Sequence, residues 1–418
     1  MQFLEEIAAD GIEIARKITK EGLICGHCLG RQFAKISHGL SNEQRGTILK
    51  AALRASGEEL EEGKCWICNG LFEHLEGWVS KALEKLKDYE FESFLVGTKV
   101  SGLLLQNEEL LWEIAGASYA EPLKAELNRE VGKRLEHETG KIVDFEMPDL
   151  VVILNLWTET LELQVKPVFI YGRYRKLTRG ISQTRWFCRE CGGKGCKRCN
   201  FTGMMYPESV EGLISGPLLE EFNGEDLVLH GCGREDIDAR MLGSGRPFVV
   251  EIKEPRRRNV DLLRVTEQVN EANREKVEVH ELQYVGREMV VKIKDAQMDK
   301  IYRIEVEFKS LVREADLKRA LDRLSSALIE QRTPTRVVHR RADLVRNRNV
   351  YSVRLASFDG KNAVIELTCS AGLYIKELIS GDEGRTKPSL SELLGVQAEV
   401  KVLDVLDVAS GIPRENSD

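Results

Sequence analysis

Apolar side chains near the start of the chain recur at helical spacing. Residues 3–19 place an apolar residue at every third or fourth position, which predicts an amphipathic helix. A second helix is predicted to begin at Ser41, whose hydroxyl can cap it, and to end at Ser56-Gly57. The region that precedes residue 77 is therefore predicted to be mainly helical.

Residues 77–180 alternate between strand-like and helix-like patterns. Residues 91–100 read as a strand, 126–140 as a helix ended by Gly140, and 147–165 as two strands. A basic stretch follows that contains Lys166, Arg173, Arg175, Lys176 and Arg179 with Tyr171 and Tyr174 interleaved. Cations and aromatic rings on one edge favour an RNA-binding unit, although a solvated strand edge remains the alternative.

The second half of the chain shows the same mixture of patterns. Helices are predicted over 209–222 and 314–331, and strands over 246–253 and 276–285. A hairpin is predicted to turn at Asp359-Gly360. Two packed halves, divided near residues 188–199, are the simplest organisation.

Composition narrows the class of protein. The chain has 418 residues, of which 42% are hydrophobic and 31% charged, which is typical of a globular protein rather than a disordered one. No uncharged apolar run reaches the roughly 18 residues of a membrane span, and acidic residues near the start argue against a secretory signal. We therefore expect a soluble cytoplasmic protein. The net charge of −7 means that a nucleic acid would be held by local basic patches.

Eight of the ten cysteines form four CxxC pairs. Such pairs place two sulfurs on one turn, which favours metal binding over disulfides. The first set is Cys25, Cys28, Cys65 and Cys68, with spacing C-x2-C-x36-C-x2-C. Four thiolates would close a structural zinc site, and four unrelated buried cysteines are the alternative.

The second set is Cys188, Cys191, Cys196 and Cys199, with spacing C-x2-C-x4-C-x2-C. Its glycine-rich spacer would let both pairs fold onto one zinc ion. Two alternatives stay open. One is an unmetallated loop, and the other is an iron–sulfur site that would use the last three cysteines with a distant fourth and would give Cys188 no role. One zinc is thus expected at the first set, with a second left open here.

Residues 231–252 place a dense set of ionisable side chains in a glycine-flanked loop before an apolar strand. The set comprises Arg234, Glu235, Asp236, Asp238 and Arg240. Catalytic groups concentrate on such loops, but a structural ion-pair network would look the same.

The motif in residues 233–243, G-R-E-D-I-D-x-R-M-L-G, resembles the aspartate loop of the archaeal and eukaryotic tRNA pseudouridine synthases that act on uridines 54 and 55 of the T-arm. Six further segments resemble that family in the same order: the cysteine-bearing N-terminus, AELNREVGKRLE, FIYGRYRKLTRGISQTRW, EIKEPRRRN, QRTPTRVVHRRAD and GRTKPSLSELLG.

The resemblance implies an α/β (α+β) fold in four segments. These are a helical zinc-knuckle segment (1–76), a THUMP-like RNA-binding domain (77–182), the second cysteine cluster (183–205) and a catalytic domain with a mixed, mainly antiparallel sheet (206–418). It also implies a tRNA partner bound through its T-arm. No obligatory protein partner and no redox or group-transfer cofactor are expected.

The same resemblance assigns residue roles. Asp236 matches the catalytic aspartate, with Asp238 as the alternative, and Lys376 matches the basic residue that pairs with it. Lysine would keep that carboxylate charged in a closed pocket. Tyr302 matches the aromatic residue that stacks on the target uracil, Tyr374 a substrate contact, and Leu378 an apolar wall of the pocket. Leu373 departs from the family, where a small or hydroxylated residue is common.

Further contacts with RNA are expected from basic residues. Arg234 is predicted to fill the space that a flipped uridine leaves, and Arg175 and Lys176 to bind substrate. Basic stretches at 253–258 and 332–348 are predicted to contact phosphates. The competing interpretation is a non-catalytic, zinc-containing RNA-binding protein, which would need no pairing of Asp236 with Lys376.

Overall fold

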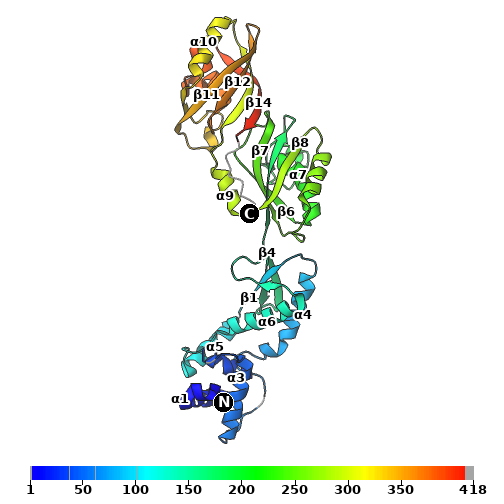
Figure 1. Cartoon of the computed structure of the whole chain (residues 1–418), viewed down its shortest axis with the longest axis vertical. Helices are drawn as coiled ribbons and strands as arrows, with labels where there is room; N and C mark the ends of the chain where they lie inside the picture. The colour runs from blue at the N-terminus through cyan, green and yellow to red at the C-terminus, as the bar shows by residue number, and fades with distance from the viewer. Residues whose placement is uncertain (1, 37, 62, 101, 410–418) are drawn as a thin grey trace. The chain divides into compact units, whose positions relative to one another are not determined.

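The computed structural model describes residues 2–36, 38–61, 63–100 and 102–409. The chain forms two compact units. Unit 1 contains residues 1–166 with 256–258, and unit 2 contains residues 167–255 with 259–418 (Figure 1). Each unit has its own hydrophobic interior, so we describe each by itself.

Unit 1 combines a helical N-terminal part with a small sheet. Its helices are α1 (Gln2–Glu21), α2 (Gly26–Gly30), α3 (Asn42–Ala55), α4 (Leu75–Leu86), α5 (Gly102–Ala115) and α6 (Leu123–Thr139). Its strands are β1 (Ser93–Lys99), β2 (Ile142–Val143), β3 (Leu150–Asn155) and β4 (Thr160–Val165), in the order β2-β1-β3-β4. One continuous core joins the helical part to the sheet, so the predicted segments 1–76 and 77 onward share one unit.

Local signals in the sequence explain several ends of these elements. Ser41 caps α3 and forms a capping box with Gln44, and α6 ends at Gly140 in the left-handed region. Both predictions are confirmed. The two predicted strands within 147–165 are also present, as the antiparallel pair β3 and β4.

Unit 2 is built on a ten-stranded sheet. Its strands are β5 (Val168–Lys176), β6 (Asp226–Gly231), β7 (Arg240–Lys253), β8 (Val277–Val285), β9 (Lys300–Phe308), β10 (Leu328–Arg332), β11 (Val345–Phe358), β12 (Asn362–Cys369), β13 (Thr386–Lys387) and β14 (Ala398–Val408). The order is β13-β10-β11-β12-β9-β14-β7-β5-β8, with β6 paired to β7. Among the described strand pairs of this ten-stranded sheet, only the short β14–β7 pairing is parallel, which confirms the mixed, mainly antiparallel sheet.

Helices pack on this sheet and divide its interior into two cores. They are α7 (Val210–Phe222), α8 (Leu262–Ala272), α9 (Glu288–Asp295), α10 (Glu314–Leu324), α11 (Ile375–Ser380) and α12 (Leu390–Leu394). Residues of β5–β8, α7 and α8 form one core, and residues of β9–β12, α10 and α11 form the other. Tyr302 packs against both cores, which places it at the seam between the two halves of the sheet.

Two boundary predictions are wrong. The THUMP-like domain was expected to reach residue 182, but β5 pairs with β7 and β8 inside the larger sheet, so this strand belongs to unit 2. The helix expected over 314–331 ends at Leu324, because Ser326 takes a positive φ of 61° and the chain continues as strand β10. Burial alternates along β10, as expected of a strand with one face on the core and one face exposed.

The basic stretch at 253–258 also differs from its prediction in part. Residues 256–258 return to unit 1, where Arg258 donates hydrogen bonds to the backbone carbonyls of Asp149 and Lys166. The side chain of Arg258 is largely buried, so it serves the fold of unit 1 rather than a phosphate. No helix in the part of the chain that the structure describes is long and apolar enough to span a membrane.

Candidate active site

The loop that connects β6 to β7 forms one side of a cavity of about 230 Å3 at the seam of the large sheet. The cavity is lined by Gly233, Arg234, Glu235, Asp236, Ala239, Lys300, Tyr302, Arg336, Val337, Arg341, Gly372, Leu373, Tyr374, Ile375, Leu403 and Val405. The seam is where Asp404 and Val405 of β14 pair with the first residues of β7. A loop entering β7 is therefore placed beside the residues of β9 and β14.

Buried hydrogen bonds hold this loop in place. Glu235 is fully buried, accepts hydrogen bonds from the Tyr174 hydroxyl at 2.8 and 3.0 Å, and pairs with Arg246 Nε at 2.7 Å. Arg246 also donates to the carbonyl of Cys232, and Gln183 donates to the carbonyl of Gly233. Because a buried charge without its partner is costly, this network fixes the loop strongly.

Lys176 was predicted to contact substrate, but its side chain instead bonds to the backbone of this loop. Its ammonium is fully buried and donates to the carbonyls of Ile181, Asp236 and Ile237 at 2.9–3.2 Å. Burial lowers the pKa of Lys176, while the nearby Glu235 acts in the opposite direction. Because Lys176 is fully buried and bonded to these carbonyls, its side chain holds the loop and is not accessible to a substrate.

The rest of the predicted basic edge is also mostly structural. Arg173 is buried and donates to the carbonyls of Ser244, Gly245 and Val408, and Tyr174 is fully buried. Arg179 donates to the carbonyl of Asp238, on the same loop. Arg175 differs, since 42% of its side chain is exposed although it bonds to Gly243 and Glu278. Its role as a substrate contact stays a prediction.

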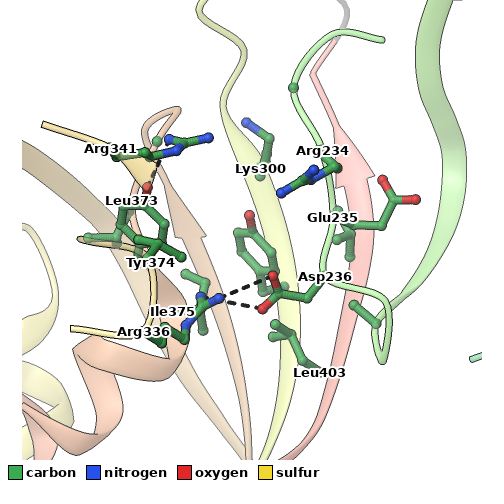
Figure 2. Close-up of a pocket in the computed structure, with 16 residues that line it drawn as sticks. Arg234, Glu235, Asp236, Lys300, Arg336, Arg341, Leu373, Tyr374, Ile375 and Leu403 are labelled. Carbon is green, nitrogen blue, oxygen red and sulfur yellow. Dashed lines mark hydrogen bonds and ion pairs between the residues drawn. The ribbon is translucent and has the colours of Figure 1, made fainter. Parts of the chain in front are cut away.

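Asp236 projects into the cavity between two cations. Its carboxylate lies 3.4 Å from Arg336 Nη2 and 3.4 Å from Lys376 Nζ (Figure 2 shows the arginine). A third of the Asp236 side chain is exposed in this structure without RNA. The predicted meeting of Asp236 and Lys376 is thus present, with a second cation that the sequence analysis did not assign.

Asp238 takes the nearer position to Lys376. The ammonium of Lys376 lies 2.8 and 3.0 Å from the two oxygens of Asp238, closer than Asp236. Burial raises the pKa of Asp238, but the hydrogen bonds and charge of Lys376 outweigh it and hold this pKa below its ordinary value. Asp238 is 62% exposed and does not line the cavity, so it shares the lysine from outside.

Aromatic residues form two sides of the cavity. Tyr302 and Lys300 reach it from β9, and burial raises the pKa of Tyr302 while it lowers that of Lys300. Tyr374 lies at the start of α11, where Arg341 donates to its hydroxyl at 2.9 Å and the Arg336 guanidinium lies 5.7 Å from its ring centre. Both predicted tyrosines therefore reach the same space as Asp236.

Two predictions about apolar and basic neighbours have different outcomes. Leu378 does not line the cavity: it lies further along α11 and is buried in the core with Ile379. Leu373 and Ile375, at the start of that helix, line the cavity instead, together with the apolar side chains of Ala239, Val337, Leu403 and Val405. Arg234 does line the cavity, with its guanidinium 5.2 Å from the ring centre of Trp186.

Sequence reasoning missed three residues that matter to this geometry. Arg336 and Arg341 lay within a basic stretch of many arginines, and nothing in their order marked the pair that faces the cavity. Glu235 stood inside the recognised motif but was treated only as part of a charged cluster. Its burial could be inferred only from partners on distant strands, Tyr174 and Arg246.

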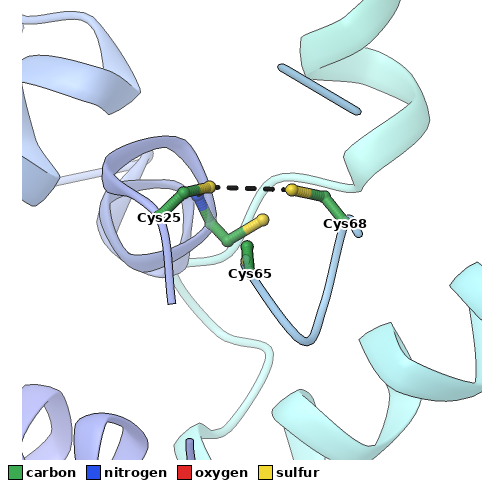
Figure 3. Close-up of side chains that lie close together, drawn as sticks. Cys25, Cys65 and Cys68 are labelled. Carbon is green, nitrogen blue, oxygen red and sulfur yellow. Dashed lines mark hydrogen bonds between the residues drawn. The ribbon is translucent and has the colours of Figure 1, made fainter. Parts of the chain in front are cut away.

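The first cysteine set converges on one point, as expected. One sulfur from each of Cys25, Cys28, Cys65 and Cys68 lies within 4.8 Å of the others, and the Cys25 and Cys68 sulfurs are 3.7 Å apart (Figure 3). Four sulfurs at about 2.3 Å from a tetrahedral zinc would be roughly 3.8 Å apart. These residues fit a zinc ion.

The second set meets the same criterion. The sulfurs of Cys188, Cys191, Cys196 and Cys199 all lie within 4.8 Å of one another, with three of the distances at 3.8 Å. Cys188 belongs to the group, whereas the iron–sulfur alternative gave it no role. Both clusters are therefore consistent with zinc binding.

Comparisons with known proteins agree with this geometry. A family profile described as "Pus10, C-terminal" matches residues 169–409, and one described as "Pus10 THUMP domain, archaeal" matches residues 78–155. The chain belongs to the Pus10 family of tRNA pseudouridine synthases. Among its curated relatives, the tRNA pseudouridine synthase Pus10 of Methanothrix thermoacetophila is 49% identical, over 97% of this chain and 96% of the relative.

Two further Pus10 relatives match along almost their whole length. That of Halorubrum lacusprofundi is 43% identical over 96% of both chains, and that of Methanopyrus kandleri is 42% identical over 95% of this chain and 98% of the relative. This Pus10 member is accordingly an isomerase that acts on tRNA, with a THUMP domain in unit 1. The interpretation as a non-catalytic RNA-binding protein is set aside.

Proposed function

We propose that this enzyme converts uridine to pseudouridine at position 54, position 55 or both in the T-arm of tRNA, with Asp236 as its catalytic carboxylate. The observation that carries the proposal is the position of Asp236. Its carboxylate faces the cavity, lies 3.4 Å from each of two cations, and shares the cavity with Tyr302 and Tyr374. Asp238, by contrast, lies outside the cavity lining.

The reaction needs a charged carboxylate and no external electrons. The N1–C1′ bond of uridine breaks and a C5–C1′ bond forms, while C5 loses a proton and N1 gains one, so product and substrate are isomers. For this reason we propose that no redox or group-transfer cofactor takes part. Asp236 would act as nucleophile or base, with the cations of Arg336 and Lys376 each 3.4 Å from its carboxylate.

The remaining cavity residues suit a base that has left the helical stack. Tyr302 would stack on the uracil, and Tyr374 would contact it from the opposite element. Such stacking returns about 1–3 kcal/mol per base, which offsets part of the cost of flipping. Arg234, at the edge of the cavity, would fill the space that the uridine leaves.

Arg336 would have to yield space on binding, because it now contacts both Asp236 and the Tyr374 ring. Its Nε also pairs with Glu377 at 2.7 Å, a partner that can keep the guanidinium beside the cavity. We propose that phosphate contacts by residues of 332–348 favour this rearrangement. The proposal includes no obligatory protein partner, and the enzyme would work in the cytoplasm on transcribed tRNA.

We propose zinc as the resident metal of the first cysteine set, held by Cys25, Cys28, Cys65 and Cys68. Four thiolate ligands leave no open position for substrate, so this zinc would stabilise the fold and take no part in the reaction. The geometry of the four sulfurs supports this assignment.

Replacement of the carboxylate tests the proposal. Asp236→Asn keeps the size of the side chain but removes its charge, and we expect at least about a 10³-fold loss of pseudouridine formation on an unmodified tRNA transcript, with tRNA affinity retained. Pseudouridine would be mapped at positions 54 and 55 separately.

Two matched variants control for general effects of losing a carboxylate. Asp238→Asn should reduce activity far less, because that residue lies outside the cavity lining, and Asp322→Asn on the exposed face of α10 should have no effect. Wild-type activity in Asp236→Asn would reject the assignment of the catalytic residue. Product at neither T-arm position with wild-type enzyme would reject the proposed target.

A further inference from the structure

Residues 186–205 form an excursion of unit 2 whose two ends lie side by side. Phe187 and Met204 pair as an antiparallel bridge. The backbone N–H of Met205 donates to the carbonyl of Trp186 at 2.7 Å, and that of Cys188 to the carbonyl of Gly203 at 2.7 Å. We refer to residues 187–204 as the finger. Its two ends are held together, so its conformation is set locally rather than by the sheet.

The second cysteine set braces the finger from within. Backbone N–H groups of Gly195, Cys196 and Gly203 point at cysteine sulfurs at 3.2–3.3 Å, as thiolate ligands require. A Cβ at Gly203 would lie 2.3 Å from the carbonyl oxygen of Gly193, so glycine is needed for this close approach. The backbone is thus shaped around the four sulfurs.

The surface of the finger combines exposed aromatic rings with positive charge. Phe187 is 57% exposed and Phe201 73% exposed, and neither belongs to a hydrophobic core of unit 2. The same finger carries four exposed cations, Arg189, Lys194, Lys197 and Arg198, of which Arg198 lies 3.8 Å from Glu190. Glu190 is the single acid of the finger. Stacking rings beside cations are the features with which proteins hold unpaired bases and their phosphates.

The base of the finger contacts the catalytic loop. Trp186 packs edge-on against Tyr206 with ring centres 5.8 Å apart, and the Arg234 guanidinium lies 5.2 Å from the Trp186 ring centre. Gln183, just before the finger, donates to the carbonyl of Gly233 at 2.9 Å. Arg234 in turn lines the cavity, so whatever the finger binds lies close to the reacting base.

We propose that the finger is a metal-braced RNA-binding element, which stacks Phe187 and Phe201 on unpaired bases of the tRNA substrate and holds adjacent phosphates with its cations. Zinc held by the second cysteine set would keep the rings and cations in position. This inference rests on the proposed function, because it takes the tRNA substrate of that function as the ligand of the finger. A protein partner is less consistent with the finger, because its cations match a polyanion.

The first test removes the finger as a unit. Because Phe187 and Met204 already pair, residues 188–203 can be replaced by an Asn-Gly turn that closes the same two strands. In an Asp236→Asn background, where no product forms, we expect the dissociation constant for unmodified tRNA to rise at least tenfold. Zinc content should fall from two ions per chain to one.

Point variants separate stacking from charge. Phe187→Ala and Phe201→Ala should each weaken tRNA binding by about tenfold, the range of one base–aromatic stack. Lys197→Ala with Arg198→Ala should weaken binding and lower the slope of log K against log salt by about one unit or more, because phosphate contacts are lost. Leu263→Ala on α8 and Lys318→Ala with Arg323→Ala on α10 are exposed controls that should change neither quantity.

The outcomes distinguish this proposal from the proposed function. If tRNA affinity is unchanged without the finger while wild-type enzyme still makes pseudouridine, the finger proposal fails and the function stands. If the wild-type chain carries only one zinc, the metal brace is rejected. In finger variants that retain Asp236, a rise in KM with an unchanged kcat supports a binding role. If such a variant loses a protein partner while its affinity for tRNA is unaltered, RNA is rejected as the ligand.

Discussion

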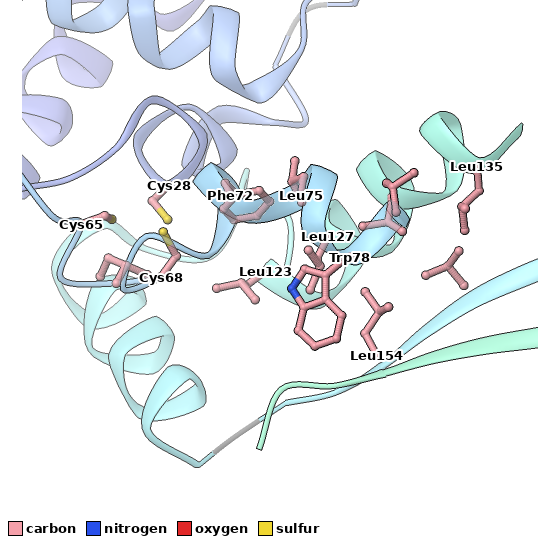
Figure 4. Packing of buried hydrophobic residues seen from close by; sticks show 14 of the residues in the cluster. Cys28, Cys65, Cys68, Phe72, Leu75, Trp78, Leu123, Leu127, Leu135 and Leu154 are labelled. Carbon is pink, nitrogen blue, oxygen red and sulfur yellow. The ribbon is translucent and has the colours of Figure 1, made fainter. Parts of the chain in front are cut away.

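The two cysteine clusters use the same ligands in opposite surroundings. In the first, Cys28, Cys65 and Cys68 are buried in the core of unit 1 beside Phe72 and Leu75 (Figure 4). In the second, three of the four cysteines are partly exposed, and the rings next to them face solvent. The first cluster lies within the continuous core that the helices of unit 1 share, whereas the second lies in one short excursion of the chain.

The first cluster also differs from the second in having a buried arginine beside it. Arg31 is completely buried and donates to the Cys28 sulfur at 2.9 Å, with Glu108 3.7 Å from its Nε. A zinc ion with four thiolates carries a net charge of −2, so a buried cation nearby offsets it. The second cluster has cations only at its exposed surface. We therefore propose that the same ligands stabilise a fold in one place and a recognition surface in the other.

The largest effect should follow loss of the first zinc. Cys65→Ser removes a buried ligand, and we expect unit 1 to lose roughly 5 kcal/mol or more, which is comparable to the whole stability of a domain. Thermal unfolding with limited proteolysis would show cleavage within residues 1–166 while unit 2 stays folded. An unaltered melting temperature of Cys65→Ser would contradict the proposed difference between the two clusters. Cys196→Ser, in the second cluster, serves as the matched control.

Arg31→Met should have the next largest effect. It leaves the thiolate charge without its buried partner, which costs about 3–5 kcal/mol in free energy of unfolding. Chemical denaturation of unit 1 measures this loss. Arg274→Met, at a site where 76% of the side chain is exposed, should change stability by less than about 0.5 kcal/mol. Equal effects from both variants would show that the arginine does not serve the cluster.

Metal removal should separate the clusters in time. The second cluster is more accessible, so a chelator should take its zinc first, with little change in the circular dichroism of the chain. Release of the second ion should then coincide with unfolding of unit 1. A single release phase for both ions would remove the distinction between them.

The smallest effect should come from the rings beside the clusters. The buried ring of Phe72 stacks on the His27 ring, with ring centres 4.5 Å apart. Phe72→Ala leaves a cavity there and should cost about 3 kcal/mol in free energy of unfolding. Phe201→Ala removes a ring that is 73% exposed and should cost less than about 0.5 kcal/mol. Urea unfolding of the two variants gives the comparison, and similar losses would mean that the finger is part of the fold after all.

Local features were readable from the sequence because their causes lie within a few residues. The CxxC spacings fixed which sulfurs share a turn, Ser41 and Gly140 marked helix ends, and the G-R-E-D motif singled out Asp236. The resemblance over the whole chain gave the family and the reaction. In each case the signal is a residue type at a defined spacing along the chain, and it can be interpreted without knowledge of tertiary contacts.

Only the tertiary structure decided how these parts are used. The sequence predicted that the basic residues of β5 would bind RNA. Instead, β5 pairs with β7 and β8 within the large sheet, and Lys176 and Tyr174 are fully buried. Arg336 reached Asp236 from a hundred residues away, through a loop whose arginines look alike in the sequence. Which side chains are buried, and which residues they contact, depends on which distant strands pair. That pairing placed the first cysteine set in the core and the finger beside the candidate active site.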